Sequence, residues 1–97
     1  MQTYIALINW TDEGVQNFKD SVDRYEAARE QMRSIGVEFR DIYWTLGGHD
    51  LVGVMEAPDD ATLAAGLLAV AGQGSIRTTT LRAFSADEMR SVISRAG

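Results

Sequence analysis

His49 and Asp50 form the most reactive pair of neighbouring side chains in the sequence, and two glycines precede them. An imidazole exchanges protons near neutral pH and a carboxylate can orient it, so the pair could serve as a general base. In the structural alternative, Asp50 accepts backbone N–H groups of the Gly47-Gly48 turn, as aspartate commonly does in loops. Because adjacent residues seldom point toward one another, we favour the structural role, with His49 as an exposed loop residue.

A threonine-rich segment carries a second set of polar side chains. In an extended chain, Thr78, Thr80 and Arg82 lie on the same side. A guanidinium can hold a carboxylate or phosphate by two parallel hydrogen bonds, and the hydroxyls can add single ones. On a face that also meets a partner chain, these residues could bind a small anionic metabolite. Alternatively, the arginine pairs with Glu56 on a neighbouring strand, and the threonines only reflect the preference of branched side chains for strands.

Three residues at expected strand ends complete the candidates. Asn9 and Trp10 end one strand-like segment and Trp44 lies in the next, so we expect them at the rim of the sheet face that the helices leave open, where a pocket would form. Tryptophan is equally an ordinary residue of dimer interfaces. The predicted ligand-binding residues are therefore Asn9, Trp10, Trp44, Thr78, Thr80 and Arg82.

The composition excludes most other reaction chemistry. There is no cysteine and only one histidine, which rules out thiol catalysis, disulfides and any site that needs two imidazoles. The glycines at residues 72–74 lack the third glycine of a dinucleotide-binding motif and lie between a helix and a strand, the reverse of the required order. We therefore predict neither a metal site nor a cofactor.

Charge and length set further limits. Nine Lys and Arg against fourteen Asp and Glu give a net charge of -5 at pH 7, and the basic residues are scattered, which argues against a nucleic-acid surface. The longest nearly apolar run, residues 63–72, is about half the length that a membrane-spanning helix needs. With no secretory or transit signal in the first residues, we expect a cytoplasmic protein with one domain, residues 1–97.

Apolar periodicity divides the chain into strands and helices. Residues 21–35 carry one apolar stripe at helical spacing and end at Gly36, and residues 85–88 have the spacing of a capping box. Residues 11–20 are expected to form an ordered connection with Thr11 as a helix cap. Strands are predicted at residues 3–9, 37–46, 51–57 and 75–84, and helices at residues 21–35, 61–70 and 86–95.

This order, β-α-β-β-α-β with a C-terminal helix, predicts an α+β fold of the ferredoxin-like split βαβ type, with an antiparallel sheet covered on one face. On the second strand, alternation places Phe39 with Tyr43 on one side and Ile42 with Trp44 on the other, so both sides are apolar. Soluble monomers seldom expose such a surface. We therefore predict a homodimer, or a higher assembly of dimers, in which two open faces meet; in the alternative, the C-terminal helix covers that face.

Stretches over nearly the whole chain carry a resemblance to a known family. They are NWT at residues 9–11, YWTLGGHD at 43–50, EAPDD at 56–60 and RTTTLRAF at 77–84, with Tyr4, Gly14 and Lys19 between them. Together they resemble the GYD-domain family of small bacterial and archaeal proteins, named for a Gly-Tyr-Asp tripeptide that corresponds here to Gly48-His49-Asp50. The resemblance implies a ferredoxin-like domain of the dimeric α/β-barrel type, and it brings no established activity with it.

Two classes of function are open on these grounds. We favour a non-catalytic oligomerising or small-ligand-binding module, because fold analogy alone does not establish catalysis. The alternative is a cofactor-independent enzyme of the dimeric α/β-barrel type that acts on a small organic acid through His49, Asp50 and Arg82.

Overall fold

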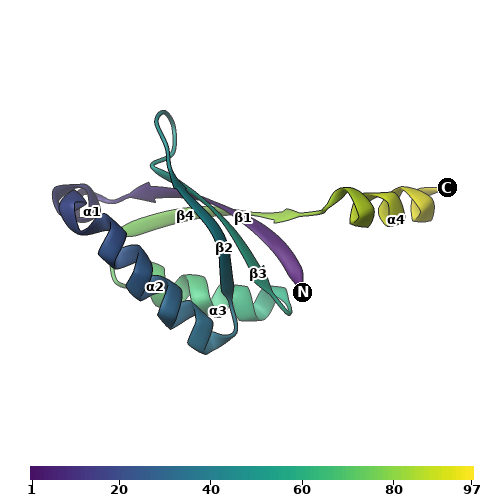
Figure 1. Ribbon diagram of the computed structural model, residues 1–97, viewed down its shortest axis with the longest axis horizontal. Coiled ribbons are helices and arrows are strands. Elements are labelled where there is room, and N and C mark those ends of the chain that lie inside the picture. Colours follow the sequence, from purple (N-terminus) through teal and green to yellow (C-terminus); the bar gives the residue numbers. More distant parts are fainter.

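The computed structural model describes residues 1–97 and contains the predicted elements in the predicted order (Figure 1). The helix at residues 21–35 and the strand at residues 51–57 begin and end where the sequence places them. The elements are β1 (Gln2–Trp10), α1 (Asp12–Gln16), a short 3-10 turn (Phe18–Asp20), α2 (Ser21–Ile35), β2 (Glu38–Trp44), β3 (Leu51–Ala57), α3 (Asp60–Ala71), β4 (Ile76–Ala83) and α4 (Ala86–Ala96).

The four strands form one antiparallel sheet in the order β2-β3-β1-β4. Helices α2 and α3 lie together on one face of this sheet (Figure 1). Between the helices and that face lies the core, which consists of Tyr4, Ala6, Ile8, Met32, Val37, Phe39, Leu51, Met55, Ala57 and Leu63. This is the ferredoxin-like arrangement. No helix has both the length and the apolar character needed to cross a membrane.

A β-bulge in β2 overturns the predicted alternation of its side chains. The pairing with β3 passes from Phe39–Met55 to Asp41–Val54 and skips Arg40. An extra residue reverses the sides of all that follow it, so Phe39 and Ile42 share the covered face, where a Cβ added at Gly53 would lie 3.2 Å from each side chain. The prediction that Phe39 and Tyr43 share a side is therefore wrong.

The uncovered side of the sheet is apolar at its centre. Ile5 of β1 pairs with Val54 on one side and Leu81 on the other, and Leu7 pairs with Val52. We call this surface the open face; its apolar residues are Ile5, Leu7, Tyr43, Val52, Val54 and Leu81. Leu81 and Tyr43 are the most exposed of them, at 46% and 62%.

Helix α4 does not cover the open face. It continues from the end of β4 and projects away from the rest of the chain (Figure 1). Every residue of α4 except Glu88 is exposed. The alternative in which the C-terminal helix shields the sheet within one chain is therefore wrong, and two apolar surfaces have no partner in the chain.

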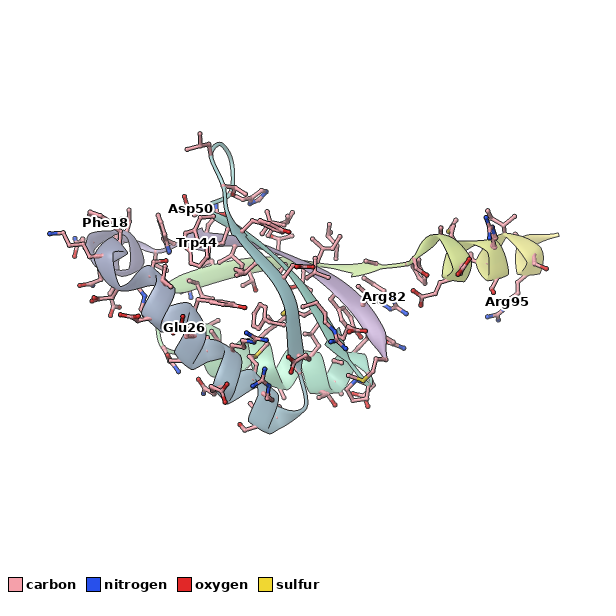
Figure 2. All side chains as sticks on the ribbon, viewed as in Figure 1. Phe18, Glu26, Trp44, Asp50, Arg82 and Arg95 are labelled. Carbon is pink, nitrogen blue, oxygen red and sulfur yellow. The ribbon has the colours of Figure 1, made fainter.

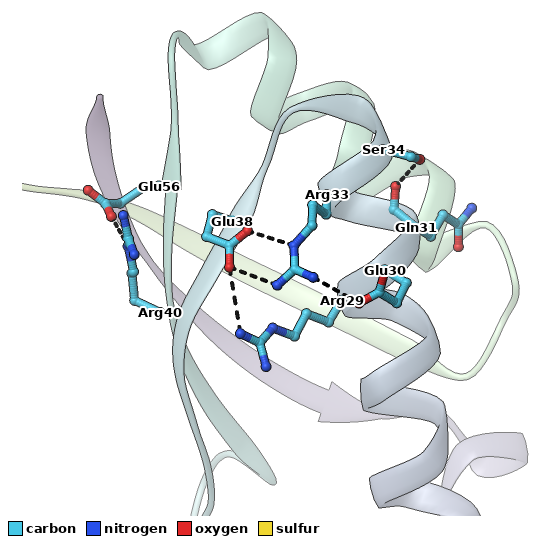
Figure 3. Close-up of polar contacts among 8 residues, drawn as sticks. All are labelled: Arg29, Glu30, Gln31, Arg33, Ser34, Glu38, Arg40 and Glu56. Atoms are coloured by element: carbon cyan, nitrogen blue, oxygen red, sulfur yellow. Dashed lines mark hydrogen bonds and ion pairs between the residues drawn. The ribbon is translucent and has the colours of Figure 1, made fainter.

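Ion pairs fasten α2 to β2 (Figure 3). The Arg33 guanidinium donates two hydrogen bonds of 3.0 Å to the Glu38 carboxylate, and a third of 2.9 Å to Glu30. The hydrogen bonds from Arg33 hold the pKa of Glu38 below its usual value. The bulge residue Arg40 reaches Glu56 on β3. These contacts fix the sharp connection after Gly36, whose φ of 109° lies in the left-handed region that favours glycine.

Close contact between α1 and the connection from α3 to β4 depends on a glycine. The Thr11 hydroxyl caps α1 by accepting a hydrogen bond from the Gly14 N–H, and it donates one of 2.6 Å to the Gly74 carbonyl. The Thr11 N–H donates to the Ser75 carbonyl at 3.0 Å. A Cβ added at Gly14 would lie 2.0 Å from that same oxygen, so the two segments pack this closely only around glycine.

We expect Gly14→Ala to lower the free energy of unfolding by about 2 kcal/mol, because the new methyl group meets backbone that has no free space to move into. Urea unfolding measures this change. The matched control is Gly48→Ala, where an added Cβ has no neighbour within 4 Å and the expected change is below about 0.5 kcal/mol. Equal losses in the two variants would contradict the packing described here.

Candidate functional site

Asp50 ties the β2–β3 hairpin to the end of β1. One of its carboxylate oxygens accepts a hydrogen bond of 2.9 Å from the Trp10 N–H, and its own N–H donates to the Ile8 carbonyl at 2.9 Å. The favoured structural role of Asp50 thus has a contact to support it, but the donor is the neighbouring strand rather than the Gly47-Gly48 turn. The carboxylate supplies the acceptor that β1 lacks on its β3 side beyond Ile8, where the pairing with β3 ends.

The His49 imidazole contacts Asn9 rather than Asp50. Its Nδ1 lies 2.9 Å from Asn9 Oδ1, while Asn9 Nδ2 donates to the Gly48 carbonyl at 3.2 Å. Because Nδ2 must donate, Oδ1 must accept, so Nδ1 of the imidazole carries the proton and Nε2 is the basic atom. Asn9 therefore has the role that the catalytic alternative gave to Asp50: it orients the His49 ring and selects its tautomer.

The predicted β4 residues lie on the covered face. Thr78 pairs with Ile8, Thr80 with Ala6 and Arg82 with Tyr4, and these β1 side chains all point into the core. The prediction that this side of β4 meets a partner chain is wrong. Alternation shows which residues share a side, but it does not show which side the helices cover.

Arg82 is held at the junction between β4 and α4. Its guanidinium donates to the backbone carbonyls of Thr3 and Ala83, and it lies 4.6 Å from the centre of the Phe84 ring. Its acidic partner is Glu88 at 3.9 Å, whereas the predicted partner Glu56 pairs with Arg40. These contacts occupy the side chain that was expected to bind an anion.

Tyr4 lies next to this arginine. The Tyr4 hydroxyl and a carboxylate oxygen of Asp60 are 2.5 Å apart, and the Arg82 guanidinium lies 5.6 Å from the centre of the tyrosine ring. Burial, followed by the hydrogen bond to Asp60, raises the pKa of Tyr4 to about 12. The phenol therefore stays protonated at neutral pH and acts as a hydrogen-bond donor in the core rather than as a base.

Trp10 lines a pocket between α2 and the sheet, and Trp44 contacts two of the residues that line it. The pocket has a volume of about 80 Å³, and nine of its thirteen lining residues are hydrophobic, including Trp10, Tyr25 and Phe39. Trp44 donates a hydrogen bond of 2.9 Å to the Ser21 hydroxyl, and its ring meets Tyr25 edge-on at 5.9 Å. The prediction that both tryptophans lie at the rim of the open face is wrong, because they point to the helix side.

The polar side chains of this pocket come from residues that the sequence did not indicate. Arg24 of α2 lines it and donates hydrogen bonds to the carbonyls of Asn17 and Gly14. Ser21, Gln73 and Ser75 are the other polar residues that line the pocket. Helical spacing places Arg24 outside the apolar stripe of α2. Its hydrogen-bond acceptors come from the irregular chain before the helix, so the residue pattern of α2 could not have indicated that Arg24 belongs to a pocket.

The eight predicted residues therefore divide between separate places. Asn9, His49 and Asp50 form the hairpin anchor, Trp10 lines the pocket, and Trp44 contacts residues that line it. Arg82 lies at the far end of β4, and Figure 2 shows it well away from Asp50. No single site collects a base, an anion-binding arginine and a cavity.

Almost the whole chain matches a known family, because residues 4–93 match the family model described as GYD domain. The chain belongs to the GYD domain family. A Thermus thermophilus protein named "Glutamine synthetase and cystathionine beta-lyase binding protein" is 36% identical to this GYD domain over 85 residues, which cover 87% of the domain and 90% of that relative. A crystal structure of a protein from Thermus thermophilus has a TM-score of 0.58 at 24% identity, covers 89% and 96% of the two chains, and has the same fold.

The hairpin anchor contains the position from which the GYD domain takes its name. At Gly48-His49-Asp50, the glycine carbonyl and the histidine ring both contact Asn9, and the aspartate binds the β1 backbone. The tripeptide thus joins the hairpin to β1 through both its backbone and its side chains. In this GYD domain, His49 occupies the position that tyrosine has in the Gly-Tyr-Asp tripeptide.

We expect Asp50→Ala to lower the free energy of unfolding by about 1–3 kcal/mol, because the half-buried Trp10 N–H loses its acceptor. His49→Ala is the control, since its ring bonds only an exposed amide, and we expect a loss below about 0.5 kcal/mol. Thermal or urea unfolding compares the two. A larger loss from His49→Ala than from Asp50→Ala would contradict the structural role of the aspartate.

A second prediction concerns Thr80, whose hydroxyl oxygen is buried and has no hydrogen-bond partner. Thr80→Val keeps the shape of the side chain and removes the unpaired polar atom, so the free energy of unfolding should rise by about 1 kcal/mol. Thr78→Val is the companion variant on the same face. Destabilisation by Thr80→Val, measured by urea unfolding, would show that the hydroxyl has a partner in the folded protein.

Proposed function

We propose that this GYD domain is a non-catalytic binding module that works as a homodimer, in which each copy covers the open face of the other. The observation that carries the proposal is the open face itself, an apolar surface on a chain whose own C-terminal helix points away from it. Soluble monomers seldom leave a contiguous apolar surface of this kind in water.

The arrangement of polarity on the open face supports a protein contact. Its apolar centre is bordered by polar side chains, with Asp41 beside Val54, Thr79 beside Leu7 and Arg77 beside Asn9. An apolar centre with a polar rim is the usual anatomy of an interface between proteins. The net charge of -5 opposes the approach of two copies, so apolar burial must supply the attraction between them.

The name of the Thermus relative supports a protein-binding role. That relative is named for binding glutamine synthetase and cystathionine beta-lyase, and we extend protein binding, with enzymes as partners, to this chain. A dimer presents every surface twice, which strengthens attachment to partners that are themselves oligomers.

A small ligand is a second candidate role, and the pocket between α2 and the sheet favours it. The pocket combines aromatic walls with the Arg24 guanidinium, which suits a small, largely apolar molecule that carries one acidic group. The enzyme alternative has less support. His49 is not among the residues that line the pocket, so its basic Nε2 has no cavity beside it in which a substrate could be held.

Leu81→Glu tests the dimer, because it places a charge on the open face at a residue that is already 46% exposed in one chain. We expect the dissociation constant of the dimer to rise at least about tenfold, which corresponds to about 1.4 kcal/mol. Sedimentation velocity over a range of concentrations measures it. The matched control is Leu68→Glu, at a residue that is 75% exposed and belongs to α3, the helix that lies on the opposite face of the sheet (Figure 1).

Circular dichroism should show that both variants stay folded. The control should sediment as the natural sequence does. Equal dissociation constants for the two variants would contradict pairing through the open face.

A further inference from the structure

We propose that two copies of this chain exchange their C-terminal helices, so that the apolar stripe of α4 packs on the open face of the partner subunit. This inference rests on the homodimer proposed above and assigns to α4 a role that the dimer alone does not require.

Helix α4 is amphipathic and has nothing to pack against in its own chain. Its apolar stripe consists of Ala86, Met89, Val92, Ile93 and Ala96, and the opposite side carries Asp87, Ser91 and Ser94. Ile93 is 59% exposed. A helix of 11 residues is only marginally stable in water without a surface to pack on, so α4 needs a partner for its stripe.

Side chains at the junction connect the end of β4 to the start of α4. A capping box fixes the helix start: the Ser85 hydroxyl accepts from the Glu88 N–H at 3.1 Å, and the Glu88 carboxylate accepts from the Ser85 N–H at 2.9 Å. Arg82 then ties the strand to the helix through Glu88 and lies over the Phe84 ring. Only Phe84 and Ser85 lie between β4 and α4, and a connection this short leaves α4 little room to fold back over the sheet of its own chain.

A second copy supplies what α4 lacks, because each copy has one apolar helix without a surface and one apolar surface without a cover. The length of α4 matches the width of the sheet. The 11 residues of the helix span about 16 Å, and the three spacings between four strands span about 14 Å. The charges agree as well. Helix α4 carries two acidic residues and two arginines. It therefore has no net charge, and the negative charge of the partner chain does not repel it.

Substitutions on opposite sides of α4 test the exchange in the full chain. Ile93→Asp places a charge in the apolar stripe, and Ser94→Asp places the same charge on the polar side. We expect Ile93→Asp to raise the dissociation constant of the dimer about tenfold or more, and Ser94→Asp to leave it within about twofold, by sedimentation velocity. Equal effects of the two substitutions would overturn the proposal.

A mixed-isotope experiment locates the helix directly, and the absence of cysteine allows a single label. Unlabelled chain with a nitroxide on Arg90→Cys is mixed with ¹⁵N-labelled chain of natural sequence. We expect broadening of the amide signals of Ile5, Leu7 and Val54, which can only come from a partner's helix. A nitroxide on Ser34→Cys, at the far end of α2, should leave these signals sharp.

The outcomes separate this inference from the dimer on which it rests. A dimer whose open-face signals stay sharp would overturn the helix exchange and leave the homodimer standing. Broadening only within a chain, seen when ¹⁵N-labelled Arg90→Cys carries the nitroxide and is diluted in unlabelled chain, would show that α4 folds back and would also overturn it. A monomer at all concentrations would overturn both proposals.

Discussion

Strand β1 is apolar on both of its sides, and the rest of the structure depends on that constraint. Tyr4, Ala6 and Ile8 face the helices, while Ile5 and Leu7 face outward between β3 and β4. Two helices can cover only one face of a four-stranded sheet, and α2 and α3 cover the side with Tyr4. The homodimer that we propose buries the other side, and each square ångström of apolar surface removed from water contributes about 25 cal/mol.

The hairpin anchor shows how a pattern that resembles a catalytic pair can serve the fold. Asp50 and His49 are adjacent in sequence, yet the carboxylate turns to the Trp10 N–H and the imidazole turns to Asn9. Both contacts join the β2–β3 hairpin to β1, the strand between β3 and β4. His49 and Asp50, the residues that first suggested catalysis, therefore hold the end of β1 in place, and β1 is the strand that carries the centre of the open face.

Local signals in the sequence were sufficient to predict the helices and strands, but not the face of the sheet on which a given side chain lies. The apolar stripe of α2, the capping box at Ser85 and the glycine after α2 are short-range patterns, and the structure confirms all three. The side on which Tyr43 lies depends on the bulge at Arg40, and the side on which Arg82 lies depends on where the helices pack. Both are properties of the assembled sheet, and no pattern within one strand contains them.

The pocket was missed for a related reason. Arg24 counts as a surface residue of α2 by helical spacing, and it becomes part of a cavity only because the chain before the helix folds its carbonyls toward the guanidinium. The sequence grouped His49 with Asp50 and assigned Asn9 to the rim of the open face; a single hairpin and the strand beside it bring the three residues together.

The molecular mass of the natural sequence in solution tests the central claim most directly. Sedimentation equilibrium over a wide range of protein concentration measures that mass without any substitution. If the open face is covered by a second copy, the mass should approach twice the 10.7 kDa of one chain as concentration rises, or an even multiple of it. A mass of one chain at every concentration would contradict the account, because the apolar side of β1 would then face water.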